Sequence, residues 1–192
     1  MRIISGQWRG RPIDAPIGKA TRPTTDRARE ALFSMLVSRI GSFEDLRVAD
    51  LFAGSGALGL EALSRGAGHC SFVETDRSAI EALKRNVDRL GAQARADIRA
   101  QSALNFSGGP FDLVLMDPPY ESGLGQQALA AMAARGSIAP GGWVSLETRP
   151  AESVEVEGFE IDAARTYGKA RITLLRRLAA GDQDWSPRQD DA

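Results

Sequence analysis

The fold of this 192-residue chain is decided by a glycine-rich stretch, DLFAGSGALG, at residues 50–59. The apolar run at residues 47–52 is typical of a short buried strand, and residues 57–65 have the pattern of a helix that Gly66 ends. Glycines between a strand and a helix let the backbone approach a ligand at the helix N-terminus, where a side chain would keep it away. The stretch therefore predicts a strand–loop–helix unit that binds a ligand.

Strands and helices continue to alternate after this unit. Strands are expected at 69–74, 96–101, 111–117 and 142–147, and helices at 78–90 and 123–134. Three short strands, at 154–156, 159–161 and 170–178, are joined by tight turns and have the pattern of an antiparallel edge. The alternation predicts an α/β fold in which helices cover both faces of a mostly parallel sheet.

The N-terminal region has a different character. Residues 1–22 place short apolar pieces between Gly and Pro, which predicts a small hairpin or a flexible extended arm, and a helix then follows N-capping residues at 24–26 and runs to residue 40. The first 40 residues carry eight basic and three acidic side chains, whereas the rest of the chain is net acidic. From charge alone, this arm is either a polyanion-binding element or a solvated surface.

We therefore divide the chain into a basic arm with its helix (1–40), an α/β domain (41–178) and a polar tail (179–192) that we expect to be disordered. A single Cys and a single His exclude an internal disulfide and a His/Cys zinc site. The sequence shows no signal-peptide apolar region and no run of about 20 apolar residues that could span a bilayer. We expect a cytoplasmic protein with no membrane association.

Two kinds of ligand fit the glycine pattern. Gly54, Gly56 and Gly59 have dinucleotide-binding spacing, and Glu74 lies about 20 residues further on, where an acid binds ribose hydroxyls. NAD or FAD binding and S-adenosylmethionine binding share this arrangement. An acid at Asp50 suits the ammonium group of a methionine moiety and would repel a pyrophosphate, which favours S-adenosylmethionine.

A second motif, DPPY at residues 117–120, directly follows the most apolar strand. Two prolines fix the backbone, so the Asp117 carboxylate and the Pro118 carbonyl can accept hydrogen bonds from an exocyclic amino group. Tyr120 offers a flat face on which a base can stack, worth about 1–3 kcal/mol. The motif indicates methyl transfer to an amino nitrogen, with positioning and electrostatics as the main terms.

On these residues the chain resembles the class I S-adenosylmethionine-dependent methyltransferases that act on exocyclic amino groups. It is more narrowly similar to the bacterial RsmD family, the 16S ribosomal RNA guanine-N2 methyltransferases. The resemblance is carried by residues 1–11, 22–33, 50–67 and 117–120. It implies a Rossmann-like fold with a seven-stranded, mostly parallel sheet, an antiparallel C-terminal strand and a small N-terminal extension.

The resemblance also implies site residues. The cofactor, S-adenosylmethionine, would be held by Asp50, Phe52, Gly54, Gly56, Glu74, Ser102 and Ala103. Ser102 departs from the family pattern, in which an Asp usually accepts from the adenine amino group. The catalytic residues would be Asp117, Pro118, Pro119 and Tyr120. No metal is expected. The candidate RNA-binding residues are Arg2, Trp8, Arg9, Arg11, Arg22, Arg27 and Arg29, since arginine contacts phosphates and Trp8 could stack on a base.

The implied partner is 16S ribosomal RNA, within a small-subunit particle, and we expect a monomer. Another substrate of the same chemistry stays open, namely adenine N6 in DNA or glutamine in a protein. The family's protein-glutamine relatives usually carry Asn at the position of Asp117, which counts against the second. A nicotinamide oxidoreductase and a non-catalytic nucleotide-binding module are further alternatives, which the Asp50 placement and the DPPY motif disfavour.

Overall fold

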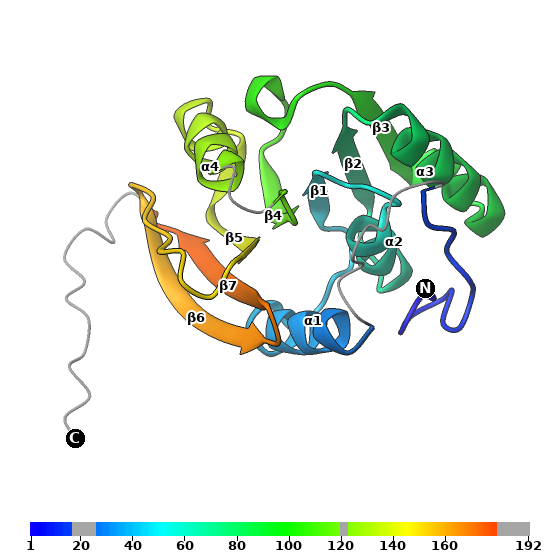
Figure 1. Ribbon diagram of the computed structural model, residues 1–192, viewed down its shortest axis with the longest axis horizontal. Helices are drawn as coiled ribbons and strands as arrows, with labels where there is room; N and C mark the ends of the chain where they lie inside the picture. The colour runs from blue at the N-terminus through cyan, green and yellow to red at the C-terminus, as the bar shows by residue number, and fades with distance from the viewer. Residues whose placement is uncertain (17–25, 120–122, 180–192) are drawn as a thin grey trace.

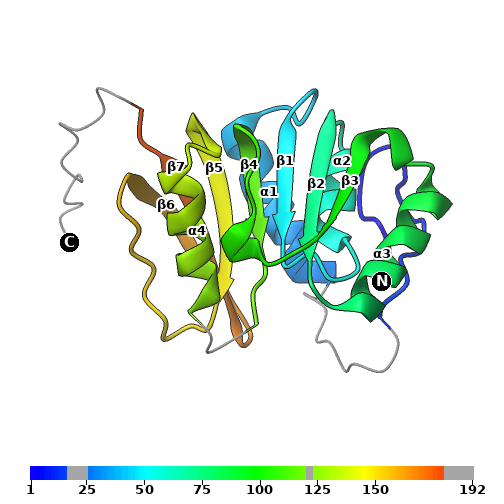
Figure 2. The ribbon, with the colours of Figure 1, turned by 90° about the horizontal axis from the view of Figure 1, so that it is seen from above.

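The computed structural model describes residues 1–16, 26–119 and 123–179. Its centre is a seven-stranded sheet in the order β3-β2-β1-β4-β5-β7-β6 (Figures 1 and 2). The strands are β1 (Arg47–Leu51), β2 (His69–Glu74), β3 (Ala96–Ala100), β4 (Phe111–Met116), β5 (Ile138–Thr148), β6 (Phe159–Tyr167) and β7 (Ala170–Arg177). The helices are α1 (Asp26–Ile40), α2 (Ala57–Ser64), α3 (Arg77–Leu90) and α4 (Leu124–Ala134), with 3-10 turns η1 (Gln93–Arg95) and η2 (Ala103–Asn105).

Neighbouring strands from β3 to β5 pair in parallel, and β7 is antiparallel to both β5 and β6. The prediction of a seven-stranded, mostly parallel sheet with an antiparallel C-terminal strand is therefore confirmed. The central strands β1 and β4 are buried along nearly their whole length because helices cover both of their faces, which explains their continuous apolar runs.

Helices lie on both faces of the sheet (Figure 2), and each face carries its own hydrophobic cluster. One joins side chains of α1, α2 and α3 to the residues of β1 and β4 that point to this face of the sheet, such as Val48 and Leu113. The other joins α4 and η2 to the alternate residues, such as Leu51 and Val114. Helices thus cover both faces, and the carboxyl ends of β1, β2 and β4 meet at one edge of the sheet.

Three predicted strands differ from the structure. The prediction of a strand at 154–156 is wrong, because this segment has no regular secondary structure. Val154 is buried in the hydrophobic cluster that contains the α4 side chains. β5 begins at Ile138, ahead of its Pro and two Gly, and its pairing with β4 shifts register between Phe111 and Leu113. β6 continues to Tyr167 because it pairs with β7 along its whole length. Its other edge is free of strand pairing within the described part of the chain, so polar residues are tolerated there.

The N-terminal arm, residues 1–16, is a small hairpin closed by an antiparallel bridge between Arg2 and Pro12. The predicted hairpin is confirmed. The indicated flexibility is not what the structure shows, because Ile3, Trp8 and Ile13 are all buried in the cluster shared by α1 and α2. The arm is therefore part of the core. None of the helices in the three described ranges has the length and apolar character needed to cross a membrane.

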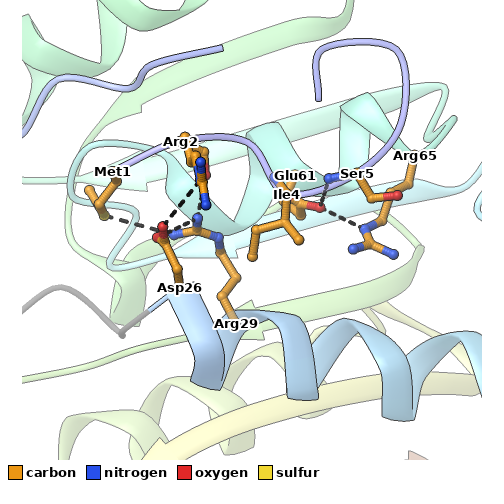
Figure 3. A network of polar contacts seen from close by, with 8 residues as sticks. All are labelled: Met1, Arg2, Ile4, Ser5, Asp26, Arg29, Glu61 and Arg65. Carbon is orange, nitrogen blue, oxygen red and sulfur yellow. Dashed lines mark hydrogen bonds and ion pairs between the residues drawn. The ribbon is translucent and has the colours of Figure 1, made fainter. Parts of the chain in front are cut away.

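A buried carboxylate on α2 anchors the arm (Figure 3). Glu61 accepts hydrogen bonds from the backbone N–H of Ile4 at 2.8 Å and of Ser5 at 3.0 Å, and from Arg65 Nε at 2.8 Å. Gly6 follows with φ +82°, and a Cβ there would lie 1.8 Å from the carbonyl oxygen of Ser64. Only glycine permits so close an approach of the arm to the end of α2.

Candidate active site

A cavity of about 540 Å³ opens at the carboxyl edge of the sheet, between the ends of β1, β2, β3 and β4. This volume is within the range of small-molecule sites, about 300–1,000 Å³. Open α/β sheets bind ligands in this crevice because the strand ends and the helix N-termini converge there. The cavity brings together most of the predicted cofactor and catalytic residues, namely Asp50, Phe52, Gly54, Glu74, Ser102, Ala103, Asp117, Pro118 and Pro119.

The three glycines of the loop after β1 have different tasks. Gly54 lines the cavity with φ +55°, and a Cβ there would meet open space, so its backbone is bare toward a ligand. Gly56, predicted to hold the methionine end, does not line the cavity: a Cβ there would lie 2.3 Å from Leu83 Cδ1 of α3. At Gly59 the clash would be with Phe72, at 2.4 Å. Two of the three glycines therefore serve packing.

Phe52 lies at the turn from β1 into this loop with φ 60°. A left-handed backbone at a bulky residue is strained and is held only where the surrounding structure requires it, frequently at functional sites. Here it turns the chain out of the strand, and Phe52 becomes part of the cavity wall.

Glu74 at the end of β2 organises two loops. Its carboxylate accepts hydrogen bonds from the backbone N–H of Gly54 at 2.9 Å, Thr75 at 2.7 Å and Asp76 at 2.8 Å. A carboxylate has about four lone-pair sites, so acceptor capacity remains toward the cavity. Glu74 thus joins the glycine loop to the start of α3 and presents an acidic oxygen to a ligand.

Asp50 is buried at the carboxyl end of β1 and accepts the backbone N–H of Gly59 at 2.9 Å. Burial raises the pKa of the Asp50 carboxyl well above its ordinary value. The Gly59 N–H opposes this rise, and the nearby Asp117 and Glu74 carboxylates add to it. An acid in these surroundings gains from the arrival of a cation, because the cation relieves both the desolvation and the repulsion.

The remaining walls follow β3 and β4. Ser102 accepts the N–H of Leu104 at 3.3 Å and so caps η2, and Ala103, the first residue of η2, is buried. Asp117, Pro118 and Pro119 line the same cavity directly after β4. Tyr120 lies outside the described residues. The structure therefore places the first three residues of the DPPY motif next to the glycine loop, as predicted.

The candidate RNA-binding residues separate into two groups. Arg2, Arg9, Arg11 and Arg27 are exposed, and Arg22 lies outside the described residues. The stacking role predicted for Trp8 is wrong, because this residue is buried and the Arg95 guanidinium covers its ring, with Cζ 5.2 Å from the ring centroid. The surface role predicted for Arg29 is wrong as well, because this side chain is fully buried.

The cavity also contains residues that sequence reasoning missed. Among them, Met1, Pro16 and Arg29 come from the N-terminal part of the chain, and Asp76, Gln101 and Leu124 come from later segments. Asp76 could have been found as the acid that N-caps α3, whereas no sequence signal places the arm against the cavity. Within the described ranges, no group of three His, Cys, Asp or Glu residues is arranged to hold a metal ion.

Comparison with known proteins agrees with this geometry. The family model described as conserved hypothetical protein 95 matches residues 1–176. The chain is 36% identical to ribosomal RNA small subunit methyltransferase D of Escherichia coli over 188 residues, covering 96% of this chain and 93% of the relative. It is 38% identical to the protein of the same name in Haemophilus influenzae over 77% of this chain and 78% of the relative.

Solved structures show the same relationship. The yhhF protein of Escherichia coli superposes with a TM-score of 0.82 at 33% identity, over 94% of this chain and 99% of that one. A hypothetical protein of Thermus thermophilus superposes with a TM-score of 0.73 at 33% identity, over 91% and 98%. The extent of these matches shows that the chain belongs to the ribosomal RNA small subunit methyltransferase D family and is a methyltransferase.

Proposed function

We propose that this enzyme transfers the methyl group of S-adenosylmethionine to the exocyclic N2 of a guanine in 16S ribosomal RNA, within a small-subunit particle, and that it acts as a monomer. In a bacterial cell this substrate places the reaction in the cytoplasm. One observation carries the proposal: Asp117, Pro118 and Pro119 line the same cavity as Gly54 and Glu74. A group suited to holding an amino nitrogen thus lies beside a loop suited to the cofactor.

The residues present fit S-adenosylmethionine. The bare backbone at Gly54 and the acid at Asp50 suit the methionine moiety, Glu74 suits the ribose hydroxyls, and Ser102 with Ala103 suits the adenine. When bound, the cofactor supplies a methyl group on a positively charged sulfur. The acidic lining favours such a cation over an anionic dinucleotide, whose pyrophosphate would be repelled by Asp50.

The chain's own residues would prepare the nitrogen. The lone pair of a guanine amino group is delocalised into the ring, so the free amine is a poor nucleophile. Asp117 and the Pro118 carbonyl would accept its two protons in hydrogen bonds and favour a pyramidal nitrogen with its lone pair directed at the methyl carbon. As the N–C bond forms, the S–C bond breaks. The nitrogen becomes cationic and then releases a proton to Asp117 or to water.

The RNA would be positioned by the exposed arginines of the arm and of α1. Arg2, Arg9, Arg11 and Arg27 can contact phosphates, which orient a nucleic acid without reading its sequence. The guanine amino group is on an edge that base pairing covers, so the target nucleotide must be unpaired or splayed out of its helix.

The direct experiment offers the enzyme four substrates with S-adenosylmethionine labelled in its methyl group. The substrates are small-subunit particles and naked 16S ribosomal RNA from cells lacking the homologous methyltransferase, genomic DNA, and a protein extract. We expect N2-methylguanosine in ribosomal RNA by nucleoside mass spectrometry, with particles labelled more than naked RNA. Label in N6-methyladenine of DNA or in protein glutamine instead would overturn the proposed substrate.

The first prediction concerns Asp117. Asp117→Asn keeps the shape of the side chain but removes the charge that stabilises the developing cationic nitrogen. We expect turnover to fall by about 100-fold or more, with affinity for S-adenosylmethionine within a few fold. Asp97→Asn, which changes a β3 carboxylate paired with Arg99 away from the cavity, is the matched control. Equal turnover in the two variants would exclude a role for Asp117 in the reaction.

A further inference from the structure

The charges around the cavity are unequal. Among the described residues that line it, four side chains are acidic, namely Asp50, Glu74, Asp76 and Asp117, and one is basic, namely Arg29. The methionine moiety of S-adenosylmethionine carries two positive groups and one carboxylate. The acids account for the positive groups and for the ribose hydroxyls. The carboxylate of the methionine moiety needs a cationic partner. Among the described residues that line the cavity, Arg29 is the basic side chain that could supply it.

Arg29 rises from the first turn of α1 and is fully buried (Figure 3). Its Nη2 donates to the carbonyl oxygen of Arg2 and to Asp26 Oδ1, the latter at 3.0 Å. Its Nη1 lies 3.8 Å from the sulfur of Met1, and its Nε has no hydrogen-bond partner among the described residues. A thioether is a weak acceptor. Two nitrogens of a buried guanidinium thus lack a strong acceptor there, although burying a charge is costly unless it is paired.

The local charge balance also favours an anion. Asp26 is shared between two arginines, since Arg2 Nε lies 3.9 Å from its other carboxylate oxygen. Asp26 is about half exposed to solvent, so water weakens its attraction for Arg29. The group of Arg2, Asp26 and Arg29 therefore keeps a net positive charge. A second carboxylate beside Arg29 would make this group neutral.

We propose that Arg29 binds the α-carboxylate of the methionine moiety through a charge-assisted hydrogen bond from Nη1, the nitrogen that contacts the weak Met1 acceptor. The Met1 thioether would give up its contact with Nη1 to the stronger acceptor. Met1 and Pro16, which also line the cavity, would form an apolar wall that keeps water from the ion pair. The inference rests on the proposed cofactor and assigns a ligand-binding role to a residue predicted to contact RNA.

The test compares two cofactors that differ only in this group, S-adenosylmethionine and its decarboxylated form. Isothermal titration should show that the wild-type enzyme binds S-adenosylmethionine about 10- to 100-fold more tightly, the range of a charge-assisted hydrogen bond. Arg29→Gln should lose this preference, with the affinity for the decarboxylated form within about twofold of wild type. Arg29→Lys should recover part of the preference, because lysine restores the charge without the planar guanidinium.

Arg65→Gln is the matched control. Arg65 also sits in the anchor of the arm, pairs with Glu61 and lies over the Phe33 ring, but it does not line the cavity. We expect this variant to be less stable yet to keep the wild-type preference between the two cofactors. A parallel loss of both affinities in Arg29→Gln would overturn the proposal and assign Arg29 to folding alone.

The wild-type measurement decides the matter even if Arg29→Gln does not fold. Equal affinity of wild type for the two cofactors would overturn the carboxylate assignment and leave the proposed function intact. Binding of neither cofactor would overturn the proposed function and, with it, this inference.

Discussion

Two buried carboxylates on neighbouring elements, Glu61 of α2 and Asp50 of β1, have opposite surroundings. Glu61 receives two backbone N–H groups and the Arg65 guanidinium, so its charge is balanced within the protein. Asp50 receives the Gly59 N–H and faces two further acids, Asp117 and Glu74. The contrast teaches that burial alone does not identify a functional acid. The first carboxylate holds the arm in place, whereas the second gains from a cation that comes from outside.

The largest expected effect is at the anchor. Glu61→Ala removes the acceptor of three donors and leaves Arg65 without its partner, so the free energy of unfolding should fall by about 3–5 kcal/mol. Urea denaturation measures this. Glu81→Ala is the control, because Glu81 forms an exposed pair with Arg77 on α3 and should change stability by no more than about 0.5 kcal/mol. Similar stabilities for the two variants would mean that Glu61 does not anchor the arm.

A smaller effect separates packing from binding in the glycine loop. Gly59→Ala would place a Cβ 2.4 Å from Phe72 and 2.6 Å from Cys70 Sγ, so it should cost about 1–3 kcal/mol of stability. Gly54→Ala meets open space and should cost about 1–2 kcal/mol, because of its left-handed backbone. Cofactor affinity should fall in Gly54→Ala, because Gly54 lines the cavity. If only Gly59→Ala lowered cofactor affinity, Gly59 would be the residue that serves binding and Gly54 the one that serves packing.

The last prediction concerns how the free energy of unfolding changes with pH. Because the Asp50 pKa is raised in the folded protein, the folded state holds a proton that the unfolded state has released, and ligand-free stability falls as pH rises from about 4 through the folded pKa. The slope for one such proton is at most about 1.4 kcal/mol per pH unit. Asp50→Asn should remove this contribution, so it gains stability relative to wild type as pH rises.

The groups that face Asp50 are Asp117, Glu74 and the Cys70 thiol, whose own pKa is raised by burial so that it stays neutral. Subtracting the variant's profile from that of wild type gives the contribution of Asp50 together with its repulsion from Asp117 and Glu74. Cofactor affinity in wild type should increase with pH over the same range, since a cation favours the ionised carboxylate. A difference between the two stability profiles that is flat from about pH 4 to about pH 8 would show that Asp50 keeps an ordinary pKa.

Sequence reasoning located the parallel strands well, because β1, β2 and β4 are buried on both faces and read as continuous apolar runs. It missed the start of β5, where Pro140 and two glycines indicate a break, and the length of β6, whose outer edge tolerates polar residues. In the site, Asp50, Gly54 and Glu74 follow from their spacing along the segment from β1 through α2 to the end of β2. Contacts between the arm and the cavity leave no such periodicity, which is why Arg29 and Trp8 were assigned to the surface.

The docking of the arm has a consequence for recognition. Asn86 of α3 donates to the carbonyl oxygens of Asp14 in the arm, at 3.0 Å, and of Ser55 in the glycine loop, at 2.9 Å. Together with the close contact of Gly6 and Ser64, this joins the guanidinium-bearing hairpin to the floor of the methyl-donor cleft as one stiff body. On the proposed function, such a body would lose little conformational entropy on binding RNA and would therefore select a matching shape over an arbitrary polyanion.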